Sequence, residues 1–159
     1  MTGIAHLDTA IAHLHVRERT DNDGADVEKF LASVRLGPGY AWCAALITYC
    51  LKAAKVVTVK IRSARALAFR TKDMIPIKEF LRSRTSEARG YILVFQQGNG
   101  SMGHVGFVYV YKNKFYTIEG NTSAGNIGSQ RDAKKGGVFP RIREYAPNAR
   151  LHIIGVVPC

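Results

Sequence analysis

The spacing of apolar residues changes once along this chain, and that change limits the folds open to it. Before about residue 55 the apolar residues recur at helical spacing, and after Gly90 they form short β-branched and aromatic runs. The spacing predicts three helices: one near the N-terminus, one after Asp23, which we expect to act as its N-cap, and one over 42–54. Short helical pieces are expected after Ser63 and around Phe80.

Five strands are expected in the second part of the chain, in the runs "YILVFQ", "HVGFVYVY", "KFYTIE", "GVFPRI" and "LHIIGVV". Helices first and strands second are typical of an α+β fold, with an antiparallel sheet packed on the helices. The 159 residues suit a single domain over 1–159, long enough to bury a core.

The sequence also bears on where the protein is made and on the state of its cysteines. The N-terminal segment has no basic start and no unbroken apolar stretch, so we expect no signal peptide and no transmembrane segment. Synthesis in the cytoplasm is expected, with any action on a cell wall following lysis or non-classical export. No Cys-x-x-Cys is present and the spacing of the histidines suggests no zinc site, so we interpret Cys43, Cys50 and Cys159 as free thiols.

The chain is strongly basic, with a formal net charge of +11. Residues 55–89 hold ten Lys or Arg and three Asp or Glu, so most of the charge lies there. This excess predicts attraction to a polyanion such as nucleic acid, a membrane surface or an anionic cell wall. A solvated basic face is the plainer alternative.

Cys43 stands at the junction between a Gly-Pro-Gly turn and the third predicted helix. A helix N-terminus favours negative charge and lowers the pKa of a thiol, which would suit a nucleophile. Packing is the other explanation, because cysteine is among the most buried residue types.

His104 is the histidine best placed to act as a base, because it follows the glycine-rich loop "QQGNGSMG" and opens a strand. His6 and His13 are expected on the polar face of the first helix. A two-residue turn at 112–113 would place His104 opposite Asn121 and Gly106 opposite Glu119. A three-residue turn would direct Glu119 to the other face.

Glu119 and Asn121 could then hold the imidazole ring by hydrogen bonds. The alternative is a polar strand end that leads into a turn, and the spacing leaves both open.

Three blocks in order, "YAWCAALITYCLKAA", "GHVGFV" and "YTIEGNTS", resemble the CHAP family of cysteine- and histidine-dependent amidohydrolases and peptidases. These are relatives of the NlpC-type cell-wall peptidases in the papain-like group. One departure is Gly90-Tyr91, where the family usually has Gly-Asp. The resemblance implies a papain-like fold, with Cys43 as nucleophile, His104 as base, Glu119 orienting His104, and Asn121 as an accessory polar residue.

The resemblance also implies a substrate, peptidoglycan, cleaved at an amide bond by an amidase or endopeptidase. Tyr40 and Trp42 are the candidate substrate-binding residues, although Trp42 could equally be a core residue. Anionic cell-wall polymers are expected partners of what we expect to be a monomer without cofactor. No metal is predicted, since "DNDG" at 21–24 is better explained as a helix cap. A phage lysin, a secreted antibacterial effector and a wall-remodelling enzyme all fit.

A rival interpretation is a non-catalytic basic module that binds a polyanion such as nucleic acid. No nucleic-acid-binding motif is evident, and aromatic residues do not interleave the basic segment. We therefore expect no specific nucleic-acid partner. Preferential alkylation of one cysteine would separate the two interpretations.

Overall fold

The computed structural model describes residues 1–83, 87–122 and 136–159. Its helical elements are α1 (Ala5–Ala12), α2 (Ala25–Ala32), α3 (Cys43–Ala53), the 3₁₀ turn η1 (Ala66–Phe69) and α4 (Ile77–Arg82). These lie where the periodicity predicts helices, to within a few residues at each end. Most of α3 is buried, which agrees with its almost uniformly apolar sequence.

The strands are β1 (Ile75–Pro76), β2 (Ile92–Gln97), β3 (Gly103–Tyr111), β4 (Phe115–Thr122), β5 (Gly137–Arg143) and β6 (Leu151–Val157). They form one six-stranded sheet in the order β1-β6-β2-β3-β4-β5, and every pairing is antiparallel. The predicted α+β class is confirmed, and the arrangement is compatible with a papain-like fold. The two-residue β1 escaped prediction because it is too short to show a period.

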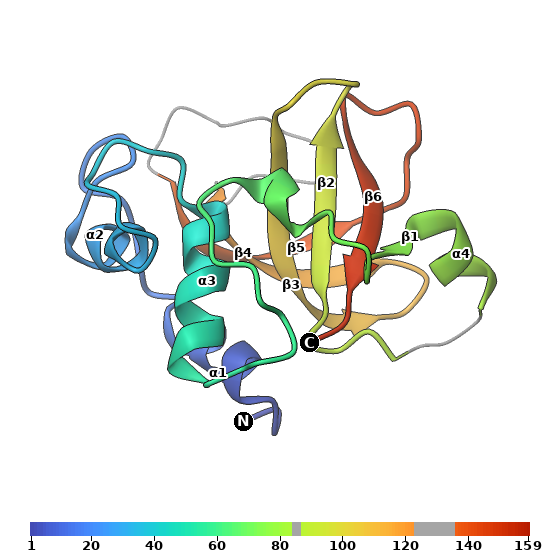
Figure 1. The fold of residues 1–159 in the computed structure, drawn as a ribbon, viewed down its shortest axis with the longest axis horizontal. Helices are drawn as coiled ribbons and strands as arrows, with labels where there is room; N and C mark the ends of the chain where they lie inside the picture. The colour runs from blue at the N-terminus through green and yellow to red at the C-terminus, as the bar shows by residue number, and fades with distance from the viewer. Residues whose placement is uncertain (84–86, 123–135) are drawn as a thin grey trace.

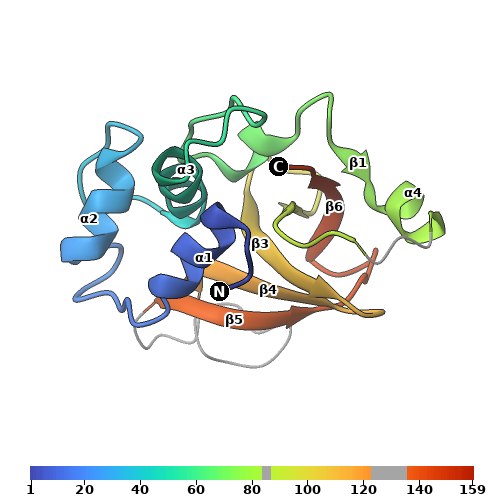
Figure 2. The ribbon, with the colours of Figure 1, turned by 90° about the horizontal axis from the view of Figure 1, so that it is seen from below.

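Helices α1, α2 and α3 gather on one side of the molecule, and α4 lies beyond β6 and β1 on the other (Figure 1). Seen from below, α1 and α3 lie over β3, β4 and β5 (Figure 2). Two apolar clusters follow from this arrangement. The larger joins the three N-terminal helices to the sheet, and the smaller lies between α4 and the sheet. Helix α3 contacts both β3 and β4, which brings its first turn to the strands that follow the glycine-rich loop.

Two N-terminal details differ from prediction. The N-cap of α2 is Gly24, not Asp23, and no side chain caps the helix. The Asp23 carboxylate instead accepts hydrogen bonds from Arg19 and Thr20 and from the Gly24 N–H. Such local bonds compete with capping, because a short acidic side chain can satisfy nearby donors outside the helix.

His6 is also displaced from its expected place on the polar face of α1. Its side chain is buried, and Nε2–H donates to the Gly90 carbonyl oxygen at 2.9 Å. The ring packs 5.1 Å from the Phe107 ring. A partner distant in sequence therefore explains why helical spacing alone misplaced this residue.

Candidate active site

Cys43 is the first residue of α3, and its side chain is 5% exposed. Trp42 is the N-cap residue and does not cap the helix with its side chain. The first N–H groups of a helix have no partner within it and carry partial positive charge. The fold therefore places the thiol at the positive end of a buried helix, as the position of Cys43 after the turn predicts.

The β3–β4 hairpin does not turn as predicted. Tyr111 pairs with Phe115, which leaves a three-residue loop, and Asn113 within it has φ of 60°. The register then shifts between Val108 and Val110, with Tyr109 as the extra residue of β3. This bulge offsets the longer loop, because a second one-residue shift restores the original facing.

Beyond the bulge, Phe107 pairs with Ile118, as the two-residue turn would require. Gly106 consequently lies against Glu119, and a β-carbon at residue 106 would be 2.4 Å from Glu119 Cγ. The absence of a side chain at Gly106 gives the Glu119 carboxylate its path to His104. The longer loop and the bulge, neither of which was predicted, therefore offset each other, and Glu119 still faces His104.

His104 and Glu119 form a buried pair. The distance from His104 Nε2 to Glu119 Oε2 is 2.8 Å, and their side chains are 12% and 0% exposed. Since Nε2–H donates to the carboxylate, Nδ1 is the ring nitrogen left for the thiol. The centre of the Phe95 ring lies 5.7 Å from the centre of the imidazole, so this ring packs against one side of the pair.

Two further residues hold the Glu119 carboxylate, and sequence reasoning missed both. Arg143 donates from Nε to Oε1 at 2.9 Å and from Nη2 to Oε2. Thr117 donates from Oγ1 to Oε1 at 2.6 Å. Thr117 carried a usable signal, because it lies two positions from Glu119 on one strand face. Arg143 lies on another strand, and nothing local distinguishes it from the other arginines.

The electrostatics of the pair favour a thiolate and an imidazolium. Burial opposes ionisation of Cys43, but His104 and the backbone N–H groups of Val105 and Ala44 outweigh it and lower the pKa of the thiol. Burial likewise opposes protonation of His104, but Cys43 and Glu119 raise its pKa to about 9. Each charge of the pair is therefore stabilised mainly by the other.

Glu119 stays ionised although it is wholly buried. Desolvation alone would raise the pKa of its carboxyl group, but Arg143 and His104 together hold that pKa well below its usual range. A carboxylate between a guanidinium and an imidazole can orient the ring and stabilise its charged form.

Asn121 contacts the start of α3. In the orientation that satisfies its neighbours, its amide oxygen accepts from the Trp42 N–H at 3.1 Å, and its nitrogen donates to Glu18 at 3.3 Å and Asn22 at 3.2 Å. Its φ of 53° breaks the alternation of β4, which explains how its side chain reaches the helix. The accessory role given to Asn121 stays a prediction.

The two candidate substrate-binding residues lie in different environments. Tyr40 is 56% exposed, so its ring is available to a ligand. Trp42 is 0% exposed, and its Nε1–H donates to Glu18 Oε1 at 2.7 Å. The prediction of direct substrate contact by Trp42 is therefore corrected: its ring is a core residue that fixes the residue before Cys43.

The other two cysteines lack the surroundings of Cys43. Burial alone raises the pKa of Cys50, and burial raises that of Cys159 to about 12. All three are free thiols.

Within the described residues no three His, Cys, Asp or Glu side chains cluster as metal ligands would. No helix of the described ranges has the length and hydropathy to cross a bilayer.

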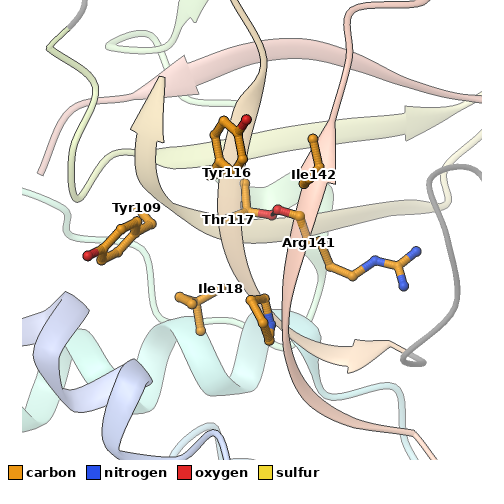
Figure 3. Close-up of a pocket in the computed structure, with 7 residues that line it drawn as sticks. Tyr109, Tyr116, Thr117, Ile118, Arg141 and Ile142 are labelled. Atoms are coloured by element: carbon orange, nitrogen blue, oxygen red, sulfur yellow. Dashed lines mark hydrogen bonds between the residues drawn. The ribbon is translucent and has the colours of Figure 1, made fainter. Parts of the chain in front are cut away.

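An apolar pocket of about 370 Å³ lies elsewhere on the sheet. Figure 3 shows the side chains around it, on β3, β4 and β5. Its lining residues are Tyr109, Tyr116, Thr117, Ile118, Pro140, Arg141 and Ile142. Cys43, His104 and Glu119 are not among them, and Thr117 is a lining residue that also contacts the candidate active site.

Comparison with known proteins agrees with this geometry. The CHAP domain family matches residues 35–121, a range that includes Cys43, His104, Glu119 and Asn121. Comparisons with curated proteins and with solved structures give no match. The matched range covers more than half of the chain and contains both the helix that carries the thiol and the hairpin that carries the imidazole and carboxylate. The chain therefore belongs to the CHAP domain family, whose members are generally hydrolytic amidases and peptidases.

Proposed function

We propose that this protein is a peptidoglycan hydrolase that cleaves an amide bond of the cell wall with Cys43 as its nucleophile. The observation that carries the proposal is the buried row Cys43–His104–Glu119, in which the thiol and imidazole favour each other's charged forms. Membership of the CHAP domain family supports the substrate class. The same charge arrangement is what thiol catalysis needs at neutral pH.

The reaction proceeds by acyl transfer. The Cys43 thiolate attacks the amide carbonyl carbon, which forms a C–S bond and moves an electron pair onto the carbonyl oxygen. Collapse of this oxyanion breaks the C–N bond, and the proton on His104 passes to the leaving amine. His104 then takes a proton from water, which attacks the thioester. Collapse of the second tetrahedral intermediate breaks the C–S bond and releases the acid product. Cys43 is then a thiolate again, and His104 keeps the proton from water, which restores the ion pair.

The start of α3 would stabilise the oxyanion. The backbone N–H of Cys43 lies at the positive end of an 11-residue helix, where no intrahelical acceptor is available to it. Removing one such donor typically costs about 10²–10³ in rate. Asn121 and Glu18 support this helix start through their contacts with Trp42.

The basic segment would bring the enzyme to the wall. Lys60, Arg65, Arg70, Lys72, Lys78 and Arg82 are exposed on it. Arg62 serves a different purpose, because its guanidinium donates to the carbonyl oxygens of Val56, Val59 and Ile61. Arg84, which the sequence grouped with these cations, lies outside the described residues. Phosphate and carboxylate groups of anionic wall polymers are the expected partners.

Incubation of the purified protein with peptidoglycan, followed by mass spectrometry of the fragments, tests the proposal and identifies the bond. Cys43→Ala is expected to abolish fragment release and to keep the fold, because alanine is a good helix former. Cys50→Ala is the matched control on the same helix and should keep most activity. Loss of activity in Cys50→Ala with activity retained in Cys43→Ala would overturn the assignment.

Wall binding is tested separately. Replacing Arg65, Lys72, Lys78 and Arg82 by Gln should weaken sedimentation with intact walls and leave turnover of a small soluble stem peptide nearly unchanged. Added salt should have the same effect as the replacement. Tight binding of nucleic acid without hydrolysis of any wall would instead favour the basic binding module.

The proposal includes where the enzyme would act and in which oligomeric state. The enzyme would act as a monomer on walls reached after lysis or non-classical export. A phage lysin, an antibacterial effector and a wall-remodelling enzyme each satisfy this, and bacteriolysis from outside would favour either of the first two.

A further inference from the structure

Arg143 is the last residue of β5, and its side chain is almost wholly enclosed, with 10% exposed. Its guanidinium meets the Glu119 carboxylate with two parallel hydrogen bonds, Nε to Oε1 and Nη2 to Oε2. The guanidinium carbon also lies 5.2 Å from the centre of the Phe95 ring, which packs against His104. Arg143 is therefore enclosed between the Glu119 carboxylate and the Phe95 ring.

The need for such a partner follows from burial. Glu119 is 0% exposed, and an ionised carboxylate without compensation is strongly disfavoured in a buried site. Thr117 donates one neutral hydrogen bond, and the imidazole is only intermittently charged during acyl transfer. Among the described residues, Arg143 supplies a permanent positive charge that hydrogen-bonds both oxygens of the carboxylate. A glutamic acid that took up a proton would no longer stabilise an imidazolium.

We propose that Arg143 is a positioning residue for the Cys43–His104 pair, acting through Glu119. Its planar fork holds the carboxylate ionised and in one orientation, so that Oε2 stays on His104 Nε2–H throughout the reaction. The proposal rests on the proposed function for its role in turnover, but it makes a statement about the thiol that can be measured without any substrate.

The chemistry favours arginine at this position. A guanidinium keeps its charge at all accessible pH values and matches both oxygens of a carboxylate at once, whereas an ammonium is a point charge. Arg143→Lys should therefore keep Glu119 ionised but lose its fixed orientation. Arg143→Gln should lose both the ionised state of Glu119 and its fixed orientation.

The test is the pH profile of Cys43 alkylation by iodoacetamide, followed by peptide mass spectrometry. In Arg143→Gln the midpoint should rise by at least about one pH unit, so that alkylation near pH 6 slows about tenfold. The midpoint of Arg143→Lys should lie between the midpoints of Arg143→Gln and of the native chain. Lys114→Gln is the matched control: Lys114 pairs with Glu144, next to Arg143, at the half-exposed surface, and its removal should leave the midpoint unchanged.

A midpoint that stays in place would make Arg143 a structural residue only and would overturn the proposal. A midpoint that falls would also overturn it, because Arg143 would then act mainly as a charge that opposes the imidazolium. If Arg143→Gln does not fold, Arg143→Lys, which keeps bulk and charge, decides between these outcomes. Absence of peptidoglycan cleavage by the native protein would count against the proposed function alone, since alkylation does not require it.

Discussion

Gly106 lies against Glu119 so closely that a β-carbon at residue 106 would be 2.4 Å from Glu119 Cγ. Because Arg143, Thr117 and His104 all hold the carboxylate, Glu119 cannot move aside cheaply. Gly106→Ala should lower wall hydrolysis by at least about 100-fold, the effect of a small misplacement at a reacting group. It should also lower the free energy of unfolding by about 1–3 kcal/mol through overpacking.

The matched control is Gly100→Ala in the loop before β3. The nearest atom to a β-carbon there is the Gln97 carbonyl oxygen, at 3.4 Å. Hydrolysis by this variant should stay close to that of the native chain. Equal losses in both variants, measured with the same wall preparation, would contradict the steric argument.

Alkylation should distinguish the three cysteines. The pKa of Cys43 is lowered and those of Cys50 and Cys159 are raised, although Cys159 is the more exposed to solvent. Iodoacetamide at neutral pH should therefore modify Cys43 first, as peptide mass spectrometry would show. Faster labelling of Cys159 would mean that accessibility outweighs ionisation and that Cys43 is not activated.

The imidazolium sets an upper pH limit on hydrolysis. His104 has its pKa raised to about 9, so it is protonated below that value and loses its proton as the pH rises through it. Hydrolysis should fall above about pH 9, because no proton is then available for the leaving amine. Alkylation of Cys43 should not fall with it, since alkylation needs only the thiolate. A parallel decline of both rates would point to unfolding.

Trp42 should matter for stability through its indole N–H. Trp42→Phe removes the donor to Glu18 Oε1 and leaves a buried carboxylate oxygen without that bond, at an expected cost of about 1–3 kcal/mol in urea unfolding. Glu18 also accepts from the Gly136 N–H at 3.0 Å, so part of its role remains. The double variant Trp42→Phe with Glu18→Gln should cost less than the sum of the two. Strict additivity would contradict a direct coupling.

His6 should make stability sensitive to acid. Burial lowers its pKa below the ordinary 6.5, although its bond to the Gly90 carbonyl acts in the opposite direction. The stabilising contribution of the neutral ring is thus present above about pH 6.5 and lost as the pH falls through the folded value. Between pH 7.5 and 5.5 the free energy of unfolding should fall less in His6→Gln than in the native chain. Parallel curves would show that His6 is not the group responsible.

Sequence patterns predicted most of the elements because the helical and strand periods reflect burial on one face of each element. They also brought Cys43, His104 and Glu119 into one hypothesis. The hairpin shows the limit of such reasoning, since a longer loop and a bulge at Tyr109 compensate each other and neither has a clear signature. Turn geometry depends on packing across the whole sheet, which local sequence does not record.

The residues that were missed or misplaced share a physical cause. Arg143, Glu18 and His6 each find a partner far away in the sequence, at Glu119, Trp42 and Gly90. A charged or polar residue type normally indicates the surface, and only a distant partner makes its burial favourable. Spacing rules describe neighbours on one element, so they cannot identify these pairs.

The thiol and the imidazole come from the two differently patterned parts of the chain, Cys43 from the helices and His104 from the sheet. Before these parts dock, Cys43 is an ordinary cysteine, and the unfolded chain has three thiols of similar reactivity. Contacts between segments so distant in sequence form late compared with local helical turns. The rate at which Cys43 reactivity changes, followed by pulse labelling during refolding, would therefore report when α3 docks onto β3. The thiol would therefore become reactive only after α3 and the sheet have come together, and not while the helices form on their own.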